Sequence, residues 1–381
     1  MERLLLLGGG HSHVEVIRRF GVRPLRDVAI TLVSPDRYTP YSGMLPGFVA
    51  GHYDYDDCHI DLEPLCAAAG ILFHHAKASA LDPDAGRVVC SDGSVVDYDV
   101  VSIDVGSTPD VRAISGALEH GIPVKPVAEF LRAWEDIHAA LRDGRRLSLA
   151  FVGGGAGAVE LAAAMHHRLT AEVSAATVPI SLLTDAASIL STHPASVQRI
   201  FERLFHRCGI EVRCGVKVAR ISPGRVECAD GSSLSADHAI IATGVGAPGW
   251  ITESGLKPDA RGFVAVNSHL QSLSHPNVFA AGDVATMVDS PRPKMGVYAV
   301  RQGPILDENL RRALRRETLH RYVPQKTALA LISTGAKRAV ASWNGIAFEG
   351  DWVWRWKDHI DRRFMAMYRR EPEIPPSVSR S

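Results

Sequence analysis

The chain has 381 residues, of which 46% are hydrophobic and 22% are charged, a balance typical of a globular protein with two domains and an appendage. Basic and acidic residues number 42 each, so no overall positive field would attract nucleic acid, and we expect no nucleic-acid partner. No stretch approaches the ~20 apolar residues of a membrane-spanning helix and no leader precedes the first apolar run, so we expect a cytoplasmic protein.

The first predicted element is an apolar strand, LLLL, which runs into a glycine-rich loop and then an apolar helix. Gly8 permits a tight turn there, and Gly10 lets the backbone approach a pyrophosphate at the helix N-terminus. His11 is a candidate phosphate contact, with a solvent-facing loop position as the alternative. His13 replaces the third small residue, and its side chain is expected to face the adenosine or to pack against Val33. A metal site is disfavoured, because no further ligands stand at suitable spacing.

The second predicted strand ends in ITLVSPDR, where dinucleotide-binding folds place an acidic residue for the adenosine ribose. Ser34 occupies that position, and its hydroxyl can hydrogen-bond a ribose with less charge assistance than a carboxylate. Dinucleotide binding by this first unit therefore remains the prediction.

The same design recurs in LSLAFVGGGAGAVELAAAM. Gly153 and Gly155 repeat the two loop glycines, and Ala158 supplies the small residue that allows a helix to pack closely on a strand. The next strand, ISLLTDA, carries Asp185 beside the ribose position. Because a carboxylate would repel a 2′-phosphate, this residue slightly favours NADH over NADPH.

Two further matches follow the loops in the same order. RVVCSDGSVVDYD corresponds to RVECADGSSLSAD, each with an Asp-Gly hairpin turn. DVGSTP, which contains Gly106, corresponds to ATGVGAP, which contains Thr243 and Gly244. The chain therefore contains two copies of one nucleotide-binding unit.

The chain is expected to return to the first unit after the second copy. NVFAAGDVA indicates a buried strand ending in a turn at Gly282 and Asp283, and RQGPILDENLRRALRRE follows helical spacing. The predicted organisation is a first unit at 1–110 and 243–317, a second unit at 111–242, and a third module at 318–381.

The third module combines aromatic and basic residues. Trp352, Trp354 and Trp356 alternate as in a strand, whereas Phe364 and Tyr368 follow helical spacing. Such a composition suits a helix lying on an anionic membrane, as a peripheral contact on its inner face. Packing on the rest of the chain, or on a second copy in a homodimer, is the alternative. The last residues, EPEIPPSVSRS, are expected to be disordered.

Two glycine loops, the ATG turn at 242–244 and a late Ala-Gly-Asp at 281–283 resemble the pyridine nucleotide-disulfide oxidoreductase family over about residues 3–309. Without a C-x-x-C pair, the chain is similar to the type II NADH dehydrogenases and sulfide:quinone reductases of that family. GGGHSHVEVIRRF with SPDRYTPYSGMLPG further resembles the flavoprotein domain fused to selenide, water dikinase in some bacteria. The resemblance implies an α/β fold of two Rossmann-like domains, the second inserted in the first, with a small C-terminal module.

The resemblance also implies FAD at the first loop and NADH or NADPH at the second, with hydride passing from nicotinamide to flavin. Electrons would then reach a quinone or another small acceptor. A reductase of a selenium or sulfur species and a nucleotide-sensing interaction protein with little turnover are the alternatives. Cys90 and Cys228 lie in the matching hairpins, a structural location, and Cys58 and Cys66 are expected to be buried structural thiols and not a redox-active disulfide.

Three side chains are candidates for the chemistry. Glu160 is expected near the nicotinamide and the flavin, to anchor the amide or relay a proton, unless it only complements the helix dipole. The resemblance implies Gln302 at the flavin or quinone, and Lys294 near the ring, where its charge would stabilise reduced flavin. Lys125 is a further basic candidate, although a linker position is favoured. Further cofactor contacts implied by the resemblance are Tyr41, Ser42, Pro46, Asp283 and Ala299.

Overall fold

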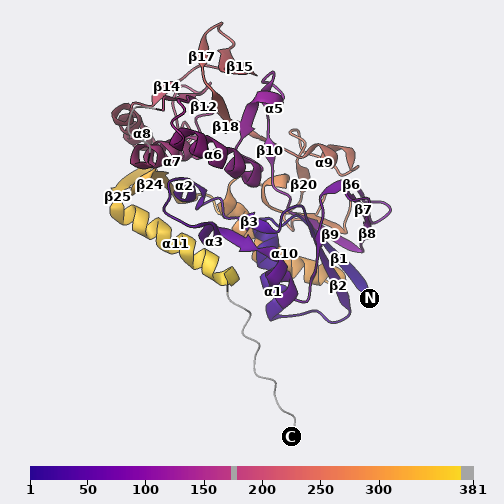
Figure 1. Ribbon diagram of the computed structural model, residues 1–381. Helices are drawn as coiled ribbons and strands as arrows, with labels where there is room; N and C mark the ends of the chain where they lie inside the picture. Colours follow the sequence, from indigo (N-terminus) through magenta and orange to yellow (C-terminus); the bar gives the residue numbers. More distant parts are fainter. Residues whose placement is uncertain (173–177, 370–381) are drawn as a thin grey trace.

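The computed structural model describes residues 1–172 and 178–369, so the predicted disorder of 371–381 lies outside the described residues. Figure 1 shows two α/β domains, with the C-terminal helix α11 running along one side of the molecule toward α1. No helix among the described residues is both long enough and apolar enough to cross a bilayer.

The first domain is built on a parallel sheet with the strand order β21-β9-β1-β2-β5. Its central strand carries the four leucines, each no more than 1% exposed, because the sheet is covered on both faces. The sheet and its two long helices are β1 (Glu2–Leu7), α1 (His11–Val22), β2 (Val28–Ser34), β5 (Leu72–His75), β9 (Val100–Ile103), β21 (Val278–Ala280) and α10 (Gly296–Leu314).

Shorter elements connect these strands and carry the loops of the first domain. Before the second domain they are β3 (Tyr38–Pro40), α2 (Leu45–Val49), α3 (Tyr55–Cys58), β4 (His59–Asp61), α4 (Leu62–Ala68), β6 (Ala78–Asp82), β7 (Arg87–Cys90), β8 (Val95–Asp97) and β10 (Thr108–Pro109). After it they are α9 (Gly249–Glu253), β20 (Val264–Val266), the 3-10 turn η1 (Gly282–Val284) and β22 (Ala285–Met287).

The second domain repeats the plan with a parallel sheet in the order β11-β18-β12-β13-β14. Its elements are α5 (Ala117–His120), β11 (Gly121–Pro123), α6 (Val127–Arg142), β12 (Leu149–Val152), α7 (Ala156–Glu172), β13 (Ile180–Leu183), α8 (Ala195–Cys208), β14 (Glu211–Arg213), β15 (Val218–Ser222), β16 (Arg225–Cys228), β17 (Ser233–Ser235), β18 (His238–Ile241) and β19 (Val245–Gly246).

The structure confirms the predicted fold class and the insertion of one unit in the other. β21 lies after the second domain in the chain, yet it pairs with β9 of the first sheet. Each domain also has an antiparallel three-stranded hairpin sheet, β6-β7-β8 in the first and β15-β16-β17 in the second, at the matched Asp-Gly turns. The helix expected in RQGPILDENLRRALRRE is α10, which begins five residues earlier than that segment, at Gly296.

The C-terminal module differs from the prediction. Its antiparallel sheet is formed by β23 (Ala330–Thr334), β24 (Ala336–Trp343) and β25 (Ile346–Gly350), and α11 (Asp351–Arg369) follows. The strand prediction for Trp352, Trp354 and Trp356 is therefore wrong, because all three lie in α11. Residues four apart share one helix face, so Trp352 and Trp356 satisfy helical spacing as well as alternation.

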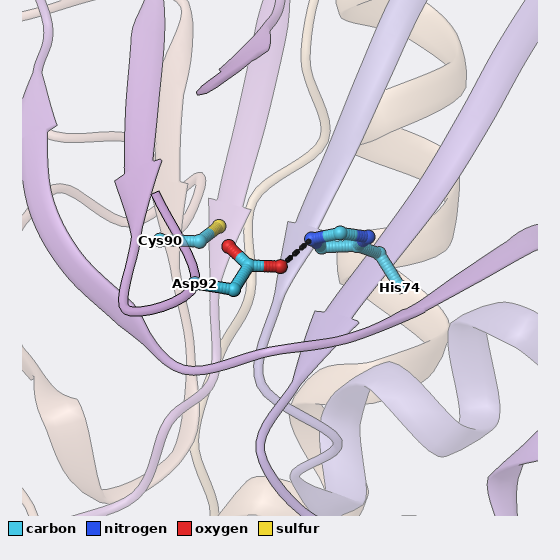
Figure 2. A group of neighbouring side chains, drawn as sticks. All are labelled: His74, Cys90 and Asp92. Carbon is cyan, nitrogen blue, oxygen red and sulfur yellow. Dashed lines mark ion pairs between the residues drawn. The ribbon is translucent and has the colours of Figure 1, made fainter. Parts of the chain in front are cut away.

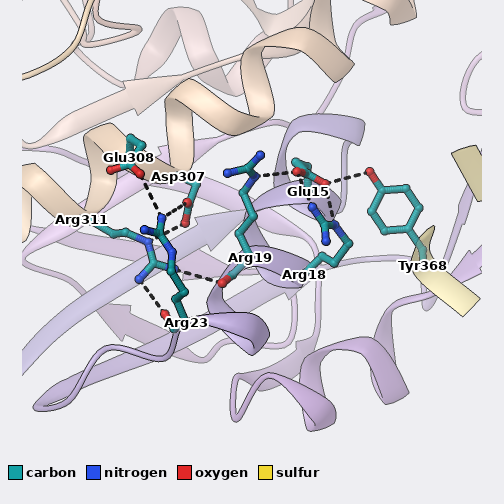
Figure 3. A network of polar contacts seen from close by, with 8 residues as sticks. All are labelled: Glu15, Arg18, Arg19, Arg23, Asp307, Glu308, Arg311 and Tyr368. Carbon is teal, nitrogen blue, oxygen red and sulfur yellow. Dashed lines mark hydrogen bonds and ion pairs between the residues drawn. The ribbon is translucent and has the colours of Figure 1, made fainter. Parts of the chain in front are cut away.

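Polar contacts hold α11 and α10 against α1 (Figure 3). The Tyr368 hydroxyl donates to Glu15 at 3.2 Å, and Glu15 also accepts from Arg18 and Arg19. Toward the C-terminal end of α1, Arg311 pairs with the fully buried Asp307 at 2.8 Å and donates to the backbone carbonyls of Arg19 and Arg23. The C-terminal helix is thus packed on the first domain along one face.

Candidate functional site

Both glycine loops place a helix N-terminus at the carboxyl end of a parallel sheet. Gly8 and Gly153 have positive φ values of 87° and 124°, a backbone conformation that only glycine adopts without strain. Around the second loop, no atom of the described residues beyond the adjoining chain and the helix backbone lies within 4 Å of a Cβ built on Gly155, Gly157 or Gly244. That open space, with the enclosed and unpartnered hydroxyl of Thr243, fits a bound nucleotide.

The first loop is more crowded. A Cβ on Gly10 would lie 2.3 Å from the Asp104 carboxylate, which accepts hydrogen bonds from the backbone amides of Ser12 at 2.8 Å and His13 at 3.2 Å. Burial raises the pKa of Asp104 to about 7, against the lowering effect of these amides. Sequence reasoning missed Asp104, although the repeat aligns it with Ala242 and so marks it as an acid where the other copy has a methyl group.

The structure places the His13 side chain between the glycine turn and β9. The imidazole is fully buried, with Nδ1 2.6 Å from the carbonyl oxygen of Gly8 and Nε2 2.8 Å from Ser102 Oγ. Burial lowers its pKa to about 4, so the neutral ring donates from Nδ1 and accepts at Nε2. His13 therefore braces the glycine turn against β9.

His11 is the first residue of α1, so the solvent-facing loop alternative is wrong. The side chain is partly buried, and its Nε2 atom is enclosed with no hydrogen-bond partner among the described residues. Burial lowers its pKa to about 4. An unpartnered nitrogen at the loop leaves this residue available to a phosphate or ribose oxygen.

The turn after β21 joins the two domains. Lys125, which follows β11, lies 2.7 Å from Asp283, which follows β21, and 3.2 Å from Ser107. Lys125 was expected to be an ordinary linker residue. Instead, its side chain pairs with Asp283, the aspartate predicted to bind the cofactor. The carboxyl ends of both sheets therefore meet at this ion pair, where open α/β sheets bind their ligands.

Gln302 and Lys294 lie beside the same turn and line one small cavity with Asp283. The Gln302 Oε1 atom accepts from the Gly282 amide at 2.7 Å. The Lys294 ammonium group donates to Thr286 at 2.9 Å and lies 4.0 Å from the centre of the Phe263 ring. Burial lowers the pKa of Lys294 to about 8, so the charge is held in a poorly solvated place.

Glu160 is placed between the second domain and the C-terminal module. Its carboxylate accepts from the Ser333 amide of β23 at 2.7 Å, and burial raises its pKa to about 7. The buried Lys357 of α11 lies near it and pairs with Asp361 at 2.6 Å, while also donating to the carbonyl of Gly43. Glu160 thus faces a buried polar cluster from the C-terminal helix, which sequence reasoning did not anticipate.

The remaining predicted contacts fall into two groups. In the first group, a Cβ on Gly282 would lie 2.3 Å from the Asp104 carboxylate. The Ala299 carbonyl accepts from the hydroxyl of Ser12, whose amide donates to Asp104, at 2.8 Å. The Tyr41 ring stacks on the Phe364 ring of α11, with 4.5 Å between the ring centroids. The other group comprises exposed Ser42, Pro46 buried on α2, Ser34 buried and donating to Asp36, Gly106 after β9, Ala158 buried in the second core, and exposed Asp185.

Two features outside this site are explained by the fold. His74, Cys90 and Asp92 lie together at the first hairpin (Figure 2), with His74 Nε2 3.3 Å from Asp92 and 2.9 Å from Ser94. The register places Arg213 at the position of His74 in the second copy, near Cys228 and Asp230. An arginine cannot bind a metal ion but can pair with the hairpin aspartate. We therefore interpret His74 as the basic partner of Asp92 and not as a metal ligand.

The first domain also carries two buried thiols in its connecting helices. Cys58 and Cys66 are both buried on short helices, and burial raises the pKa of each to about 12. A thiol with so high a pKa is a poor nucleophile at neutral pH.

Known proteins share this architecture. The sulfide:quinone oxidoreductase of Aquifex aeolicus superposes with a TM-score of 0.80 at 21% identity, covering 99% of this chain and 93% of that one. NDH2 from Plasmodium falciparum, solved in complex with NADH, superposes with a TM-score of 0.80 at 15% identity, covering 96% and 97% of the two chains. These likenesses confirm the fold.

Sequence comparison adds relatives and a family. An NADH dehydrogenase-like protein of Mycobacterium tuberculosis is 29% identical over 239 residues, 61% of this chain and 60% of the relative, so the match spans about three fifths of that protein's length. An NADH dehydrogenase-like protein of Bacillus subtilis is 21% identical over 344 residues, 89% and 91% of the two chains. The model of the pyridine nucleotide-disulphide oxidoreductase family matches residues 2–303. With this match over most of the chain and a glycine loop at the start of each parallel sheet, the chain belongs to the pyridine nucleotide-disulphide oxidoreductase family.

Proposed function

We propose that the protein is an FAD-dependent oxidoreductase that takes hydride from NADH or NADPH and passes electrons to a quinone or another small acceptor, without a redox-active disulfide. The observation that carries the proposal is the Lys125–Asp283 ion pair, which brings the carboxyl ends of the two sheets together. A nucleotide on each loop would then extend toward one shared space. Family membership supports FAD and NAD(P)H as the cofactors.

The chain's own residues would bind the two cofactors and control charge at their meeting point. When bound, the flavin supplies the redox chemistry, accepting hydride and releasing electrons to the acceptor. Gly8, Gly10 and Asp283 would hold it, and the loop at Gly153 and Gly155 would hold the nicotinamide nucleotide. Lys294 would place a positive charge where the reduced ring is anionic.

Glu160 is proposed to move a proton between solvent and the reacting centre. Its pKa of about 7 suits proton transfer in either direction at neutral pH. Lys357, which lies near Glu160, pairs with Asp361, and Asp361 lies beside the hydroxyl of Tyr41. These side chains form a series of polar groups from Glu160 to the first domain. Anchoring of the nicotinamide amide is the alternative role.

A quinone acceptor is favoured by an apolar surface on the C-terminal module. Large apolar side chains are exposed on the outer face of α11 and on the β24-β25 hairpin, whereas the charged Lys357 and Asp361 of the same helix are buried. We propose that this surface makes peripheral contact with a membrane, where a quinone is dissolved. Its members are Trp343, Ile346, Phe348, Trp352, Trp356, Ile360 and Met367.

A selenium or sulfur acceptor is the second candidate, favoured by the likeness of the loop segments to the flavoprotein domain fused to selenide, water dikinase. Because burial raises the pKa of Cys58 and Cys66 to about 12, we propose that such a species would meet the flavin directly and not through these thiols.

Anaerobic stopped-flow absorbance at the flavin band tests the proposed function. We expect FAD-loaded protein to bleach rapidly with NADH and more slowly with NADPH, and reduced protein to be reoxidised by menadione. Failure of both nucleotides to bleach bound FAD would contradict the dehydrogenase function and leave the nucleotide-sensing alternative.

A further inference from the structure

The N-terminal amides of α1 are already hydrogen-bonded within the protein. Asp104 Oδ2 accepts from Ser12 and His13, the amides that a dinucleotide pyrophosphate would approach at this end of the helix. The carboxylate also lies against Gly10 and Gly282, each of whose built Cβ atoms would come within 2.3 Å of it. A negative group of the chain therefore occupies the place where the fold favours a bound anion.

The second copy shows the same place without the carboxylate. The Asp104 amide donates to the last residue of β1, and the Ala242 amide donates to the last residue of β12, at 2.8 and 2.9 Å. The two residues are therefore structurally equivalent. Ala242 leaves the start of α7 open, with no atom of the described residues beyond the adjoining chain within 4 Å of a Cβ on Gly155.

No cation among the described residues contacts the Asp104 carboxylate. The neighbouring η1 contributes Asp283, whose negative charge further raises the pKa of Asp104, and Lys125 is paired with Asp283. From α1, His11 and His13 face this region, and burial lowers the pKa of each to about 4, so both rings are neutral. An ionised Asp104 and an FAD pyrophosphate would thus be two anions sharing one set of amides.

We propose that Asp104 couples FAD binding to the uptake of one proton. This inference rests on the proposed function, because it takes FAD as the ligand of the first loop. While it is ionised, the Asp104 carboxylate occupies the α1 amides and so competes with the cofactor phosphates for them. The proton comes from solvent and stays on the Asp104 carboxyl, which then no longer repels the phosphates and can donate an O–H hydrogen bond.

The expected pH dependence follows from the ionisation of the free protein. Below about pH 7 the free protein already carries the proton, so FAD affinity does not change with pH. Above that pH the proton must be taken up, and the affinity falls by as much as tenfold per pH unit. The second loop carries Ala242 at this place, so we expect no carboxyl at the start of α7 to make NADH binding depend on pH in this way.

Titration calorimetry of FAD into apoprotein, in buffers of different ionisation enthalpy, counts the protons taken up. For the natural chain we expect uptake rising from near zero at pH 6 to about one at pH 8.5. Asp104→Asn should abolish uptake and bind FAD about tenfold or more tightly than the natural chain at pH 8.5. Asp99→Asn changes a partly exposed carboxylate paired with Arg3; this variant is the matched control and should leave uptake unchanged.

A second variant keeps the test decisive if Asp104→Asn does not fold. Ala242→Asp installs the carboxyl at the second loop and should make NADH binding weaken above neutral pH, measured on the same FAD-loaded protein. Tight FAD binding without proton uptake at pH 8.5 would overturn this inference and leave the proposed function standing. No FAD binding at any pH would overturn both.

Discussion

At Glu160, a carboxyl with a pKa near neutrality lies against an amide of the C-terminal module. We predict that Glu160→Gln lowers turnover with a quinone by about 100-fold, because a positioned proton donor contributes at least that much. The pH profile of turnover should lose its inflection near pH 7. Steady-state rates with menadione from pH 5.5 to 8.5 provide the measurement.

Glu15 offers the control for that prediction. It stands at the equivalent place on the helix of the first copy, but its carboxylate is bound by Arg18, Arg19 and Tyr368. Glu15→Gln should alter stability and leave the inflection in place. An unchanged profile in Glu160→Gln would show that Glu160 does not transfer the proton.

Lys294 is expected to act through its charge. Lys294→Met should lower the midpoint potential of bound FAD by about 30 mV or more, a tenfold change in the two-electron equilibrium, because the reduced ring loses a cation. In the natural chain the rate of flavin reduction should fall as the pH rises through 8, where the lysine loses its charge. In the variant that fall should be absent; equal potentials in both proteins would refute this role.

For single residues, the sequence predicts a role where the residue type itself is required, as at a loop glycine. It does not predict a role that depends on which residues the fold brings together. The loop glycines were identifiable because tight turns and close approach require them. Asp104 was visible only as a mismatch between the two copies, and Lys125 is brought to Asp283 by a contact across 158 positions of sequence. No local pattern encodes such a contact.

Among the elements, α11 depends on a buried ion pair. Lys357→Met should lower the free energy of unfolding by about 3–5 kcal/mol, because it leaves the Asp361 carboxylate buried without its partner. Urea denaturation measures the loss. Arg355→Met, on the exposed face of the same helix, should change little, and the double variant Lys357→Met with Asp361→Leu should recover much of the stability.

The outer face of α11 is expected to bind the surface of a membrane. Trp352 and Trp356 are 54% and 41% exposed, so replacing both with alanine should cost little stability. The double variant should bind anionic phospholipid vesicles at least several-fold more weakly in co-sedimentation. Leu118→Ala, an exposed apolar residue of the second domain, is the control. Unchanged vesicle binding together with loss of a dimer in ultracentrifugation would favour the homodimer alternative.

The tryptophan run also shows where element prediction failed. Alternation and helical spacing overlap when residues at i and i+4 are both apolar, and only packing separates them. Val353 and Lys357 turn inward in the structure, which fixes the helical period. In contrast, the strands of the two sheets were predictable, because parallel strands covered on both faces require continuous apolar runs.

At the scale of the whole molecule, the two domains meet through one ion pair at the cofactor turns. Lys125→Ala should cost less than about 1 kcal/mol of stability, because the lysine is partly exposed. It should nevertheless slow flavin reduction by NADH about tenfold, since small misplacements of reacting groups are expensive. Stopped-flow bleaching checks this, with Arg112→Ala, an exposed neighbour paired with Asp110, as the control. An unchanged rate would show that the pair does not align the domains.

The crossing between the domains has a consequence for how such a chain could arise. The chain leaves the first domain through β10 and re-enters through β19, and these two segments are hydrogen-bonded neighbours, Thr108 opposite Gly246. The inserted copy therefore begins and ends at one point of its host. A duplicated gene segment placed in a single surface loop would produce this arrangement without breaking any strand of the older domain, and both copies could fold before either had changed its ligand.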